Sequence, residues 1–181
     1  MKKIILAAII ALSAAVAHAG LLVEPQVGWT FNQHLDAGHN YNSGNGVSYG
    51  GRLGWQKWGG QIGLDYLSSS IGMSSNDFKR NMDTKEWAAF LGYKFPVLFK
   101  VYGAYIFDAS ANTNINNGSG KFDSGTGWKL GVGTTILPFL DINLEYREGQ
   151  YGSGKVAGQN VGGRNFQATM LSISLPFNLF D

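Results

Sequence analysis

The sequence predicts an all-β fold, an eight-stranded antiparallel up-and-down transmembrane β-barrel with short turns at one end and four long loops at the other. The first observation is the strict alternation in residues 140–147, where Leu140, Ile142 and Leu144 share one strand face and Asp141 begins the opposite, polar face. The second is that similar segments recur about eight times. The third is that no run of 18 apolar residues follows residue 19, which excludes a helical membrane protein.

The connections between these segments alternate in length. Short ones at 56–59, 96–98 and 137–139 alternate with long ones at 32–45, 69–84, 109–123 and 149–164. Hairpins with short turns at one end and long loops at the other are the plan of a membrane barrel.

Residues 1–19 are predicted to be a cleaved secretory signal. Lys2 and Lys3 give a cationic start, an apolar run follows, and a small-x-small motif predicts cleavage between Ala19 and Gly20. Residues 20–181 are then expected to form one β-barrel domain. Loss of the two lysines from a chain with 14 Lys+Arg and 12 Asp+Glu leaves that domain neutral, so nothing indicates nucleic-acid binding. The absence of cysteine excludes disulfides and thiol catalysis.

The alternation places eight strands along the chain. The expected ranges are 21–31, 46–55, 60–68, 85–95, 99–108, 124–136, 140–148 and 165–177. Strand five is the least clear, because Tyr102 and Ile106 are apolar on its second face, and we choose the phase that keeps Lys100 and Asp108 together on the polar face. The last strand begins out of phase, so we expect a β-bulge near Thr169, or residues before it that project beyond the membrane.

The aromatic side chains favour a membrane barrel over a soluble eight-stranded barrel such as a lipocalin, which would point its apolar set inward. The rings are too many and too large for a lumen that eight strands just fill, and the opposite faces are rich in glycine. The rings also gather near strand ends, as in the interfacial girdles of membrane barrels. The predicted girdle residues are Trp29, Tyr66, Trp87, Trp128 and Tyr146 at the loop end, and Trp55 and Tyr93 at the turn end.

The charged residues on the polar faces are expected to point into the lumen. They are Glu24, Asp65, Glu86, Asp108, Asp141 and Glu145, together with Arg52, Lys94, Lys100, Lys129 and Arg147. Because an isolated buried charge costs several kcal/mol, these groups should form a paired network that plugs the lumen. The alternative is a gated ion path, although a selective pore would favour one sign of charge.

Over residues 20–181 the chain resembles the small eight-stranded outer-membrane barrels of Gram-negative bacteria, the OmpA-barrel and OmpX type. The resemblance implies residence in the bacterial outer membrane, with periplasmic turns, extracellular loops, and contact with membrane lipid and lipopolysaccharide. It also implies delivery by periplasmic chaperones and insertion by the barrel-assembly machinery. The family's terminal assembly signal looks like Leu171, Ile173, Leu175 and Phe177, although the chain ends in Asp181 and not in an aromatic residue. A monomer without a peptidoglycan-binding domain is expected.

Enzymatic chemistry has little support in the sequence. Some small barrels are lipid A enzymes that use His and Ser near the outer leaflet, and His34, His39 and Ser43 lie in the first long connection. Neither the His-x-Ser pairing that deacylases carry on a strand nor the amphipathic N-terminal helix of palmitoyl transferases is present. A metal site from the two histidines is the other reading, although loop spacing does not fix their geometry. We expect no catalytic residue, metal or cofactor.

Basic residues in the long connections are candidates for contact with lipopolysaccharide phosphates, or they are simply solvated. They are Lys79, Arg80, Lys155 and Arg164. We therefore predict an outer-membrane barrel with a structural or surface-interaction role, adhesion-like, through its extracellular loops. The alternatives are a small channel or transporter for ions or small molecules, and a lipid A-modifying enzyme.

Overall fold

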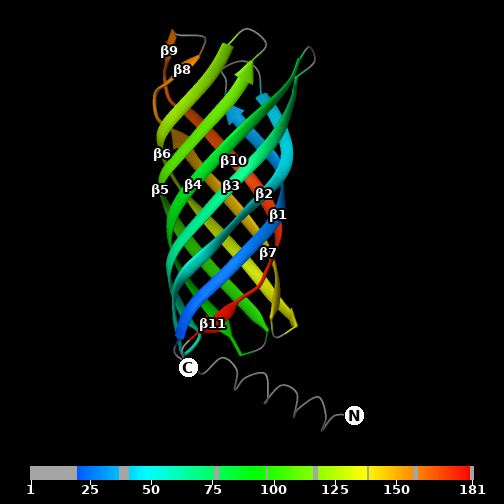
Figure 1. Ribbon diagram of the computed structural model, residues 1–181, viewed down its shortest axis with the longest axis vertical. Coiled ribbons are helices and arrows are strands. Elements are labelled where there is room, and N and C mark those ends of the chain that lie inside the picture. Colours follow the sequence, from blue (N-terminus) through cyan, green and yellow to red (C-terminus); the bar gives the residue numbers. More distant parts are fainter. Residues whose placement is uncertain are drawn as a thin grey trace.

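The protein is a closed antiparallel barrel of eight long strands (Figure 1). The computed structural model describes residues 20–36, 41–75, 78–96, 98–115, 118–137, 139–156 and 159–179, and the predicted signal at 1–19 lies outside this part. The eight strands are β1 (Gly20–Asp36), β2 (Tyr41–Lys57), β3 (Gly60–Ser75), β4 (Phe78–Phe95), β5 (Phe99–Ile115), β6 (Gly118–Leu137), β7 (Leu140–Tyr151) and β10 (Arg164–Ser174). The predicted fold class is confirmed.

Neighbouring strands pair in the order β5-β4-β3-β2-β1-β10-β7-β6, and pairing of β5 with β6 closes the barrel. Three short strands complete the sheet. They are β8 (Gly154–Val156), which pairs with β6, β9 (Gln159–Val161), which pairs with β8, and β11 (Phe177–Leu179), which pairs with the start of β1. Among the described residues, no helix is long and apolar enough to cross a membrane.

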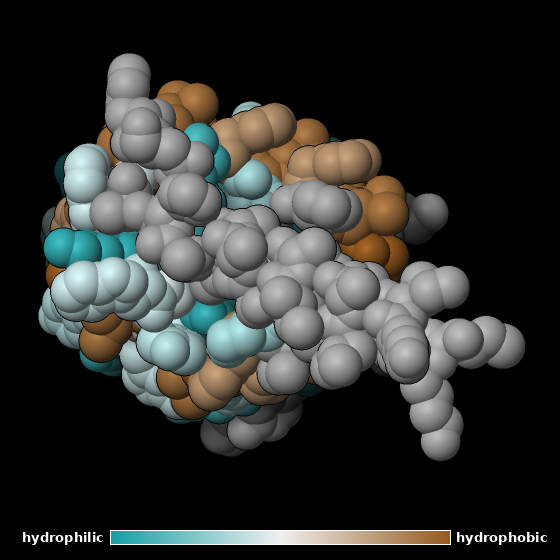
Figure 2. All heavy atoms as spheres, turned by 90° about the horizontal axis from the view of Figure 1, so that it is seen from below, coloured by the Kyte–Doolittle hydropathy of each residue, from teal (hydrophilic) through white to brown (hydrophobic). Residues whose placement is uncertain are grey.

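The lower part of the wall, toward the short turns, is apolar outside and carries the charged side chains inside, together with a few apolar ones such as Leu22 and Phe90. Leu91 and Leu130 are exposed on the outer surface, whereas Glu24, Asp65 and Glu145 are buried in the lumen. In the view from the turn end, hydrophobic side chains gather along the upper right margin of the barrel (Figure 2). A hydrocarbon environment requires this arrangement, because closed strand pairing satisfies the backbone and the apolar side chains meet lipid.

The long connections predicted from the sequence are wrong in extent, because most of their residues continue the strands. Pairing runs up to Asp36 and Tyr41 between β1 and β2, to Ser75 and Phe78 between β3 and β4, and to Ile115 and Gly118 between β5 and β6. Three hairpins therefore continue the barrel beyond the loop-end aromatic residues. We call this upper part, with β8 and β9, the cap.

The strands invert their polarity where they enter the cap. Inside the cap the side chains are apolar, as with Ile71, Met82 and Phe122, and they form a buried cluster. On its outer surface, polar residues are exposed, including Asn45, Asp83, Lys85, Asn112, Lys121, Asp123, Gln150 and Gln167. This is the pattern of a water-soluble β-structure, so the same strands are built for lipid below and for water above.

Register shifts in β1, β5 and β6 lie close to the level of this inversion. In β1 the shift falls between Phe31 and His34, where Asn32 has φ 52°. In β6 it falls beside Ser124, which has φ 57°. A bulge adds one residue to a strand, so every later side chain moves to the other face. The residues that point inward after the bulge are therefore those that regular alternation would have placed outside.

The shift in β5 overturns the expectation for Asp108. Trp87 pairs with Asp108 but Ala88 pairs with Ile106, so Phe107 and Asp108 form a bulge on the outer side. Asp108 is exposed and not in the lumen, because the bulge ends the regular alternation from which its position was predicted.

The bulge expected near Thr169 is absent from β10, whereas the alternative expectation, that residues before Thr169 project beyond the membrane part, agrees with the burial of Phe166 in the cap. Pairing of β10 with β7 is continuous from Arg164 to Ser174, and the irregularity lies on the facing strand, β1. Phe166 and Ala168 belong to the inward set, where they are buried. The sequence of β10 looked out of phase because the cap reverses which face is apolar.

Candidate functional site

The centre of the lumen is organised around Arg52 on β2. Its guanidinium donates to three carboxylates: Nε to Asp65 at 3.1 Å, Nη1 to Glu24 at 3.4 Å, and Nη2 to Glu145 at 3.2 Å. Glu24 and Asp65 are its direct cross-strand neighbours on β1 and β3. Glu145 on β7 reaches it across the lumen, so this one cation links β2 to β1, β3 and β7.

Tyr102 on β5 completes the environment of Arg52. Its hydroxyl donates to Glu145 Oε2 at 3.1 Å, and the Arg52 guanidinium carbon lies 3.8 Å from the centre of its ring. The desolvated guanidinium of Arg52 therefore contacts three carboxylates and also the face of an aromatic ring.

Glycines on β6 make the room for this arrangement. Gly131 lies between Tyr102 and Glu145 in the cross-strand row, and a Cβ on Gly131 would lie 2.0 Å from Tyr102 Cζ. Gly133 plays the same part for Lys100, whose Cε would lie 2.8 Å from an added Cβ. The inner face is rich in glycine because the large side chains of neighbouring strands lie across these positions and leave no room for a Cβ.

A second set of ion pairs lies toward the turn end. Lys100 Nζ contacts Glu24 and, at 2.8 Å, Asp141 Oδ2. Asp141 also accepts a hydrogen bond from Thr135 Oγ1 at 2.6 Å and lies 3.8 Å from Lys94 Nζ. Glu24 therefore joins this set to that around Arg52.

A third set lies toward the cap. Lys129 Nζ is 3.4 Å from Asp65 Oδ2 and 3.8 Å from Glu145 Oε1. Arg147 Nη1 lies 3.1 Å from Glu86 Oε1, and its Nη2 donates to Thr30 Oγ1 at 3.2 Å. The ion pairs thus occupy successive levels of the lumen.

The described lumen holds five carboxylates and five cations in these pairs. They are Glu24, Asp65, Glu86, Asp141 and Glu145 with Arg52, Lys94, Lys100, Lys129 and Arg147. Ten of the predicted lumen residues are therefore brought together, and Asp108 alone is not. Its removal from the set makes the two signs equal, which suits a structural network because each charge has a partner.

An apolar core closes the lumen above the charges. Ile71, Met73 and Met82 from β3 and β4 meet Phe122, Tyr151 and Phe166 from the other side. The rings of Tyr151 and Phe166 are 4.6 Å apart between centroids. Burial raises the pKa of the Tyr151 hydroxyl above its ordinary value, so it stays neutral where the cap core meets the charged lumen.

Sequence reasoning missed this cap core. A usable pattern was present, because Ile71 and Met73 alternate with glycine and serine inside a segment interpreted as a loop. The segment's Ser, Asn and Gly content favoured a turn-rich interpretation instead.

The predicted girdle residues all point outward. Trp29, Trp55, Trp87, Tyr93, Trp128 and Tyr146 are exposed, and Tyr66 is half-buried. Several touch one another across strands, as Trp128 and Tyr146 do with 5.5 Å between ring centroids. Such amphipathic rings prefer the headgroup level of a bilayer.

The residues of the predicted assembly signal also lie on the outer wall. Leu171 and Ile173 are on β10, Phe177 is on β11, and Leu175 lies between the two strands. The Leu175 N–H donates to the Pro25 carbonyl at 3.0 Å, so the seam between the first and last strands keeps a hydrogen bond where the prolines interrupt it.

A polar cleft of about 540 Å³ opens on the outer side of the cap. Lys121 on β6 and Lys155 on β8 are cross-strand neighbours in this cleft, and Asn160 on β9 continues the row. Lys121 Nζ pairs with Asp123 Oδ2 at 3.0 Å. Because Lys121 is paired with Asp123 and Lys155 is directly opposite Lys121, the described residues of the cleft keep one net positive charge, which favours anionic groups.

The candidate enzymatic residues are not arranged as a catalytic site. His34 is opposite Ser43 in the β1–β2 register, but its Nδ1 lies 2.9 Å from the Asn32 carbonyl oxygen. His39 and the side chains of Lys79 and Arg80 lie outside the described part of the chain. Within that part, no cluster of three or more His, Cys, Asp or Glu side chains is arranged to hold a metal ion.

Comparison with known proteins agrees with this architecture. A family model described as "Outer membrane protein beta-barrel domain" matches residues 4–175. The structure of Neisserial surface protein A (NspA) matches with a TM-score of 0.60 and 13% identity, covering 88% of this chain and 99% of NspA. Ail, the attachment invasion locus protein of Yersinia pestis, matches with a TM-score of 0.59 and 11% identity, covering 87% of this chain and 99% of Ail. At these identities the likeness shows the fold, and no curated protein matches the sequence.

Proposed function

Since the chain belongs to the outer membrane β-barrel domain family, we propose that it is a non-conducting surface barrel whose cap binds partners outside the cell. The location in the bacterial outer membrane follows from the family. The observation that carries the proposal is the apolar core inside the cap, because it lies directly above a charge-balanced lumen. Two layers of packed side chains oppose the passage of water, and the hairpins that hold the upper layer present a rigid polar surface.

The channel alternative has less support. A conducting path would need a continuous polar lining, whereas Ile71, Met82 and Phe166 converge above the ion pairs. A selective pore would also carry an excess of one sign of charge. The enzyme alternative needs a nucleophile and a base within hydrogen-bond reach, and His34 is bonded to its own strand's backbone.

Planar-bilayer conductance tests the non-conducting part of the proposal. The purified, refolded barrel should give no current in moderate salt, with folding verified by the mobility shift between unboiled and boiled samples. Steady discrete current steps from the folded protein would reject it.

The row of Lys121 and Lys155 indicates the chemistry of the partner, which we propose to be a polyanionic glycan. Ail, which shares the fold, has been solved in complex with the heparin analogue sucrose octasulfate. Two opposed ammonium groups can approach neighbouring sulfate or phosphate groups of one polymer, and the attraction should weaken with salt.

Cell adhesion tests the partner. Cells that display the barrel should bind heparin-coated surfaces in low salt. A K121Q/K155Q variant should lose most of this binding, whereas K85Q, which removes an exposed cap lysine outside the cleft, should keep it. Equal binding by the three would show that the lysine row is not the contact.

A further inference from the structure

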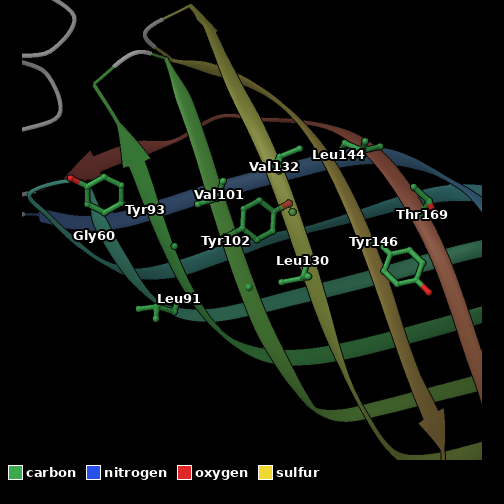
Figure 3. A pocket seen from close by; sticks show the side chains of 13 residues that line it. Gly60, Leu91, Tyr93, Val101, Tyr102, Leu130, Val132, Leu144, Tyr146 and Thr169 are labelled. Carbon is green, nitrogen blue, oxygen red and sulfur yellow. The ribbon is translucent and has the colours of Figure 1, made fainter.

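The outer wall carries a groove of about 860 Å³ that crosses β4–β7 and extends to Gly60 on β3 and Thr169 on β10 (Figure 3). Two parallel rows of outward side chains form its walls. One row runs through the cross-strand neighbours Leu91, Gly103, Leu130, Tyr146 and Thr169. Its residues lie in the lipid-facing part of the wall, where Leu91 and Leu130 are exposed.

The second row runs parallel to the first, closer to the short turns. It passes through Gly60, Tyr93, Val101, Val132 and Leu144. Between the two rows lies the backbone of Gly92, Tyr102 and Gly131. These three positions belong to the face of the sheet that points into the lumen. The groove therefore has apolar walls and a backbone floor, and none of the described residues that line it is charged.

Two glycines make this furrow deeper than the ordinary gap between rows of side chains. Gly103 leaves a break in the first row, between Leu91 and Leu130, and Gly60 leaves one in the second. A Cβ on Gly103 would meet only the Leu130 Cδ2 methyl, at 3.3 Å, and a backbone oxygen at 3.8 Å. A Cβ at Gly103 would therefore require a small shift of the flexible end of Leu130 but would not clash with the backbone, and the absent side chain leaves the groove open at this point.

The two ends of the groove differ in charge. At the turn end, Lys57 is the cross-strand neighbour of Gly60 and so continues the second row, with its Nζ 4.3 Å from the centre of the Trp58 ring. At the loop end, the Tyr146 hydroxyl donates to the Glu148 carboxylate at 3.1 Å. A ligand that fits has an apolar chain and an anionic group at the turn end.

We infer that the groove binds one acyl chain of a phospholipid from the periplasmic leaflet, with the lipid phosphate beside Lys57. The short turns of such barrels face the periplasm, so Lys57 and Trp58 lie at the headgroups of that leaflet. Lysine near the membrane surface attracts anionic headgroups, and the furrow orders the chain by contact along its length.

Other occupants fit the charges less well. Lipopolysaccharide would enter from the loop end, where its phosphates would meet the carboxylate of Glu148 and no cation of the groove. A second copy of the barrel would have to pack a convex row of its own side chains into the groove. Its Lys57 would then have no anionic partner.

Native mass spectrometry of the full barrel tests the inference. The protein is refolded into phosphatidylglycerol vesicles, transferred to a mild detergent, and examined for retained lipid. The wild type should keep one phospholipid. Gly103→Leu should lower the retained fraction by about tenfold or more, since burial of even a few methylene groups is worth that factor.

Ala89→Leu is the matched control, because Ala89 is a small, exposed residue on the neighbouring strand β4 that does not line the groove. It should retain lipid as the wild type does. Lys57→Gln should lower retention of phosphatidylglycerol while leaving the gel shift of the folded barrel unchanged. If Gly103→Leu does not fold, Gly103→Val fills the same break with less bulk.

Three kinds of outcome would overturn the inference. The first is no retained lipid in the wild type, or equal retention in the Gly103 variants. The second is preferential retention of added lipopolysaccharide that Lys57→Gln does not change. The third is a dimer that Gly103→Leu abolishes, which would make a second copy the occupant. The cap and its partner are not involved, so the result is independent of the proposed function.

Discussion

The guanidinium carbon of Arg52 lies 3.8 Å from the centre of the Tyr102 ring, and the same ring's hydroxyl donates to a carboxylate that Arg52 also contacts. Arginine suits this position because its planar fork can face several acceptors and still stack on a ring. A lysine would offer three N–H donors from a single nitrogen, without the planar group that stacks on Tyr102.

Arg52→Ala should strongly destabilise the barrel, because Glu24, Asp65 and Glu145 would lose a shared cation in a buried site. Removal of one partner from a buried ion pair typically costs about 3–5 kcal/mol. The midpoint of urea unfolding in lipid vesicles measures the effect, with the exposed Lys85→Ala as control. Equal midpoints for the two variants would contradict a structural role for the network.

Gly131→Ala should destabilise by about 1–3 kcal/mol, because the new methyl group would occupy the position of the Tyr102 ring. In a Tyr102→Ala background the same change should be nearly neutral, which gives a coupling energy of similar size. Gly162→Ala is the control, since a Cβ there meets nothing within 4 Å. Additive unfolding energies would show that the ring and Gly131 do not interact.

Phe166→Ala should loosen the cap by about 3–5 kcal/mol, because it leaves a cavity beside Tyr151 in the apolar core. Hydrogen exchange of the cap amides should quicken while the membrane part of the barrel stays protected. The matched change at Phe107, which points outward, should leave cap exchange unaltered. Uniform acceleration along the strands would mean that the cap and the barrel unfold as one unit.

Asp108→Asn should change stability by no more than about 0.5 kcal/mol, as expected of an exposed side chain. Asp141→Asn should cost several times more, because Asp141 contacts Lys100 and Lys94 in the lumen. The two unfolding midpoints are compared, because a bulged β5 places Asp108 outside and a regular β5 would place it in the lumen. A large loss for Asp108→Asn would place that carboxylate inside.

The fold could be predicted because period-two alternation is a local property of each strand. Leu140 to Arg147 reports its two faces without help from the rest of the chain, and the same holds for Trp87 to Phe95. Most of the lumen charges followed directly, because a polar residue on a lipid-facing strand has only the interior available.

The incorrect predictions fall where the alternation of apolar and polar residues no longer indicates the same faces of the strand. A bulge at Phe107 and Asp108 adds a residue that composition does not reveal, so the phase read below it failed above it. In the cap, Ile71 and Met82 point inward, although apolar residues in the membrane part point outward. At the base of the cap the strand register shifts at the same level as the surroundings change from lipid to water. The position of this level is visible only in the pairing of the strands.

The partners inside the lumen could not be predicted from the sequence either. Arg52 and Glu145 are far apart along the chain, and the contact between them depends on barrel closure and on the space that Gly131 leaves. A single sequence indicates which residues face inward but not which cation meets which carboxylate.

The continuation of the strands past the membrane has a consequence for immune recognition. Paired strands about 4.8 Å apart set side chains from distant positions, such as Asp83, Asn112 and Lys121, side by side on one surface. An antibody raised against this surface would bind residues of three strands at once, and its epitope would vanish on boiling. Linear peptides copied from single hairpins would elicit antibodies of a different kind, which recognise the unfolded chain and leave intact cells unlabelled.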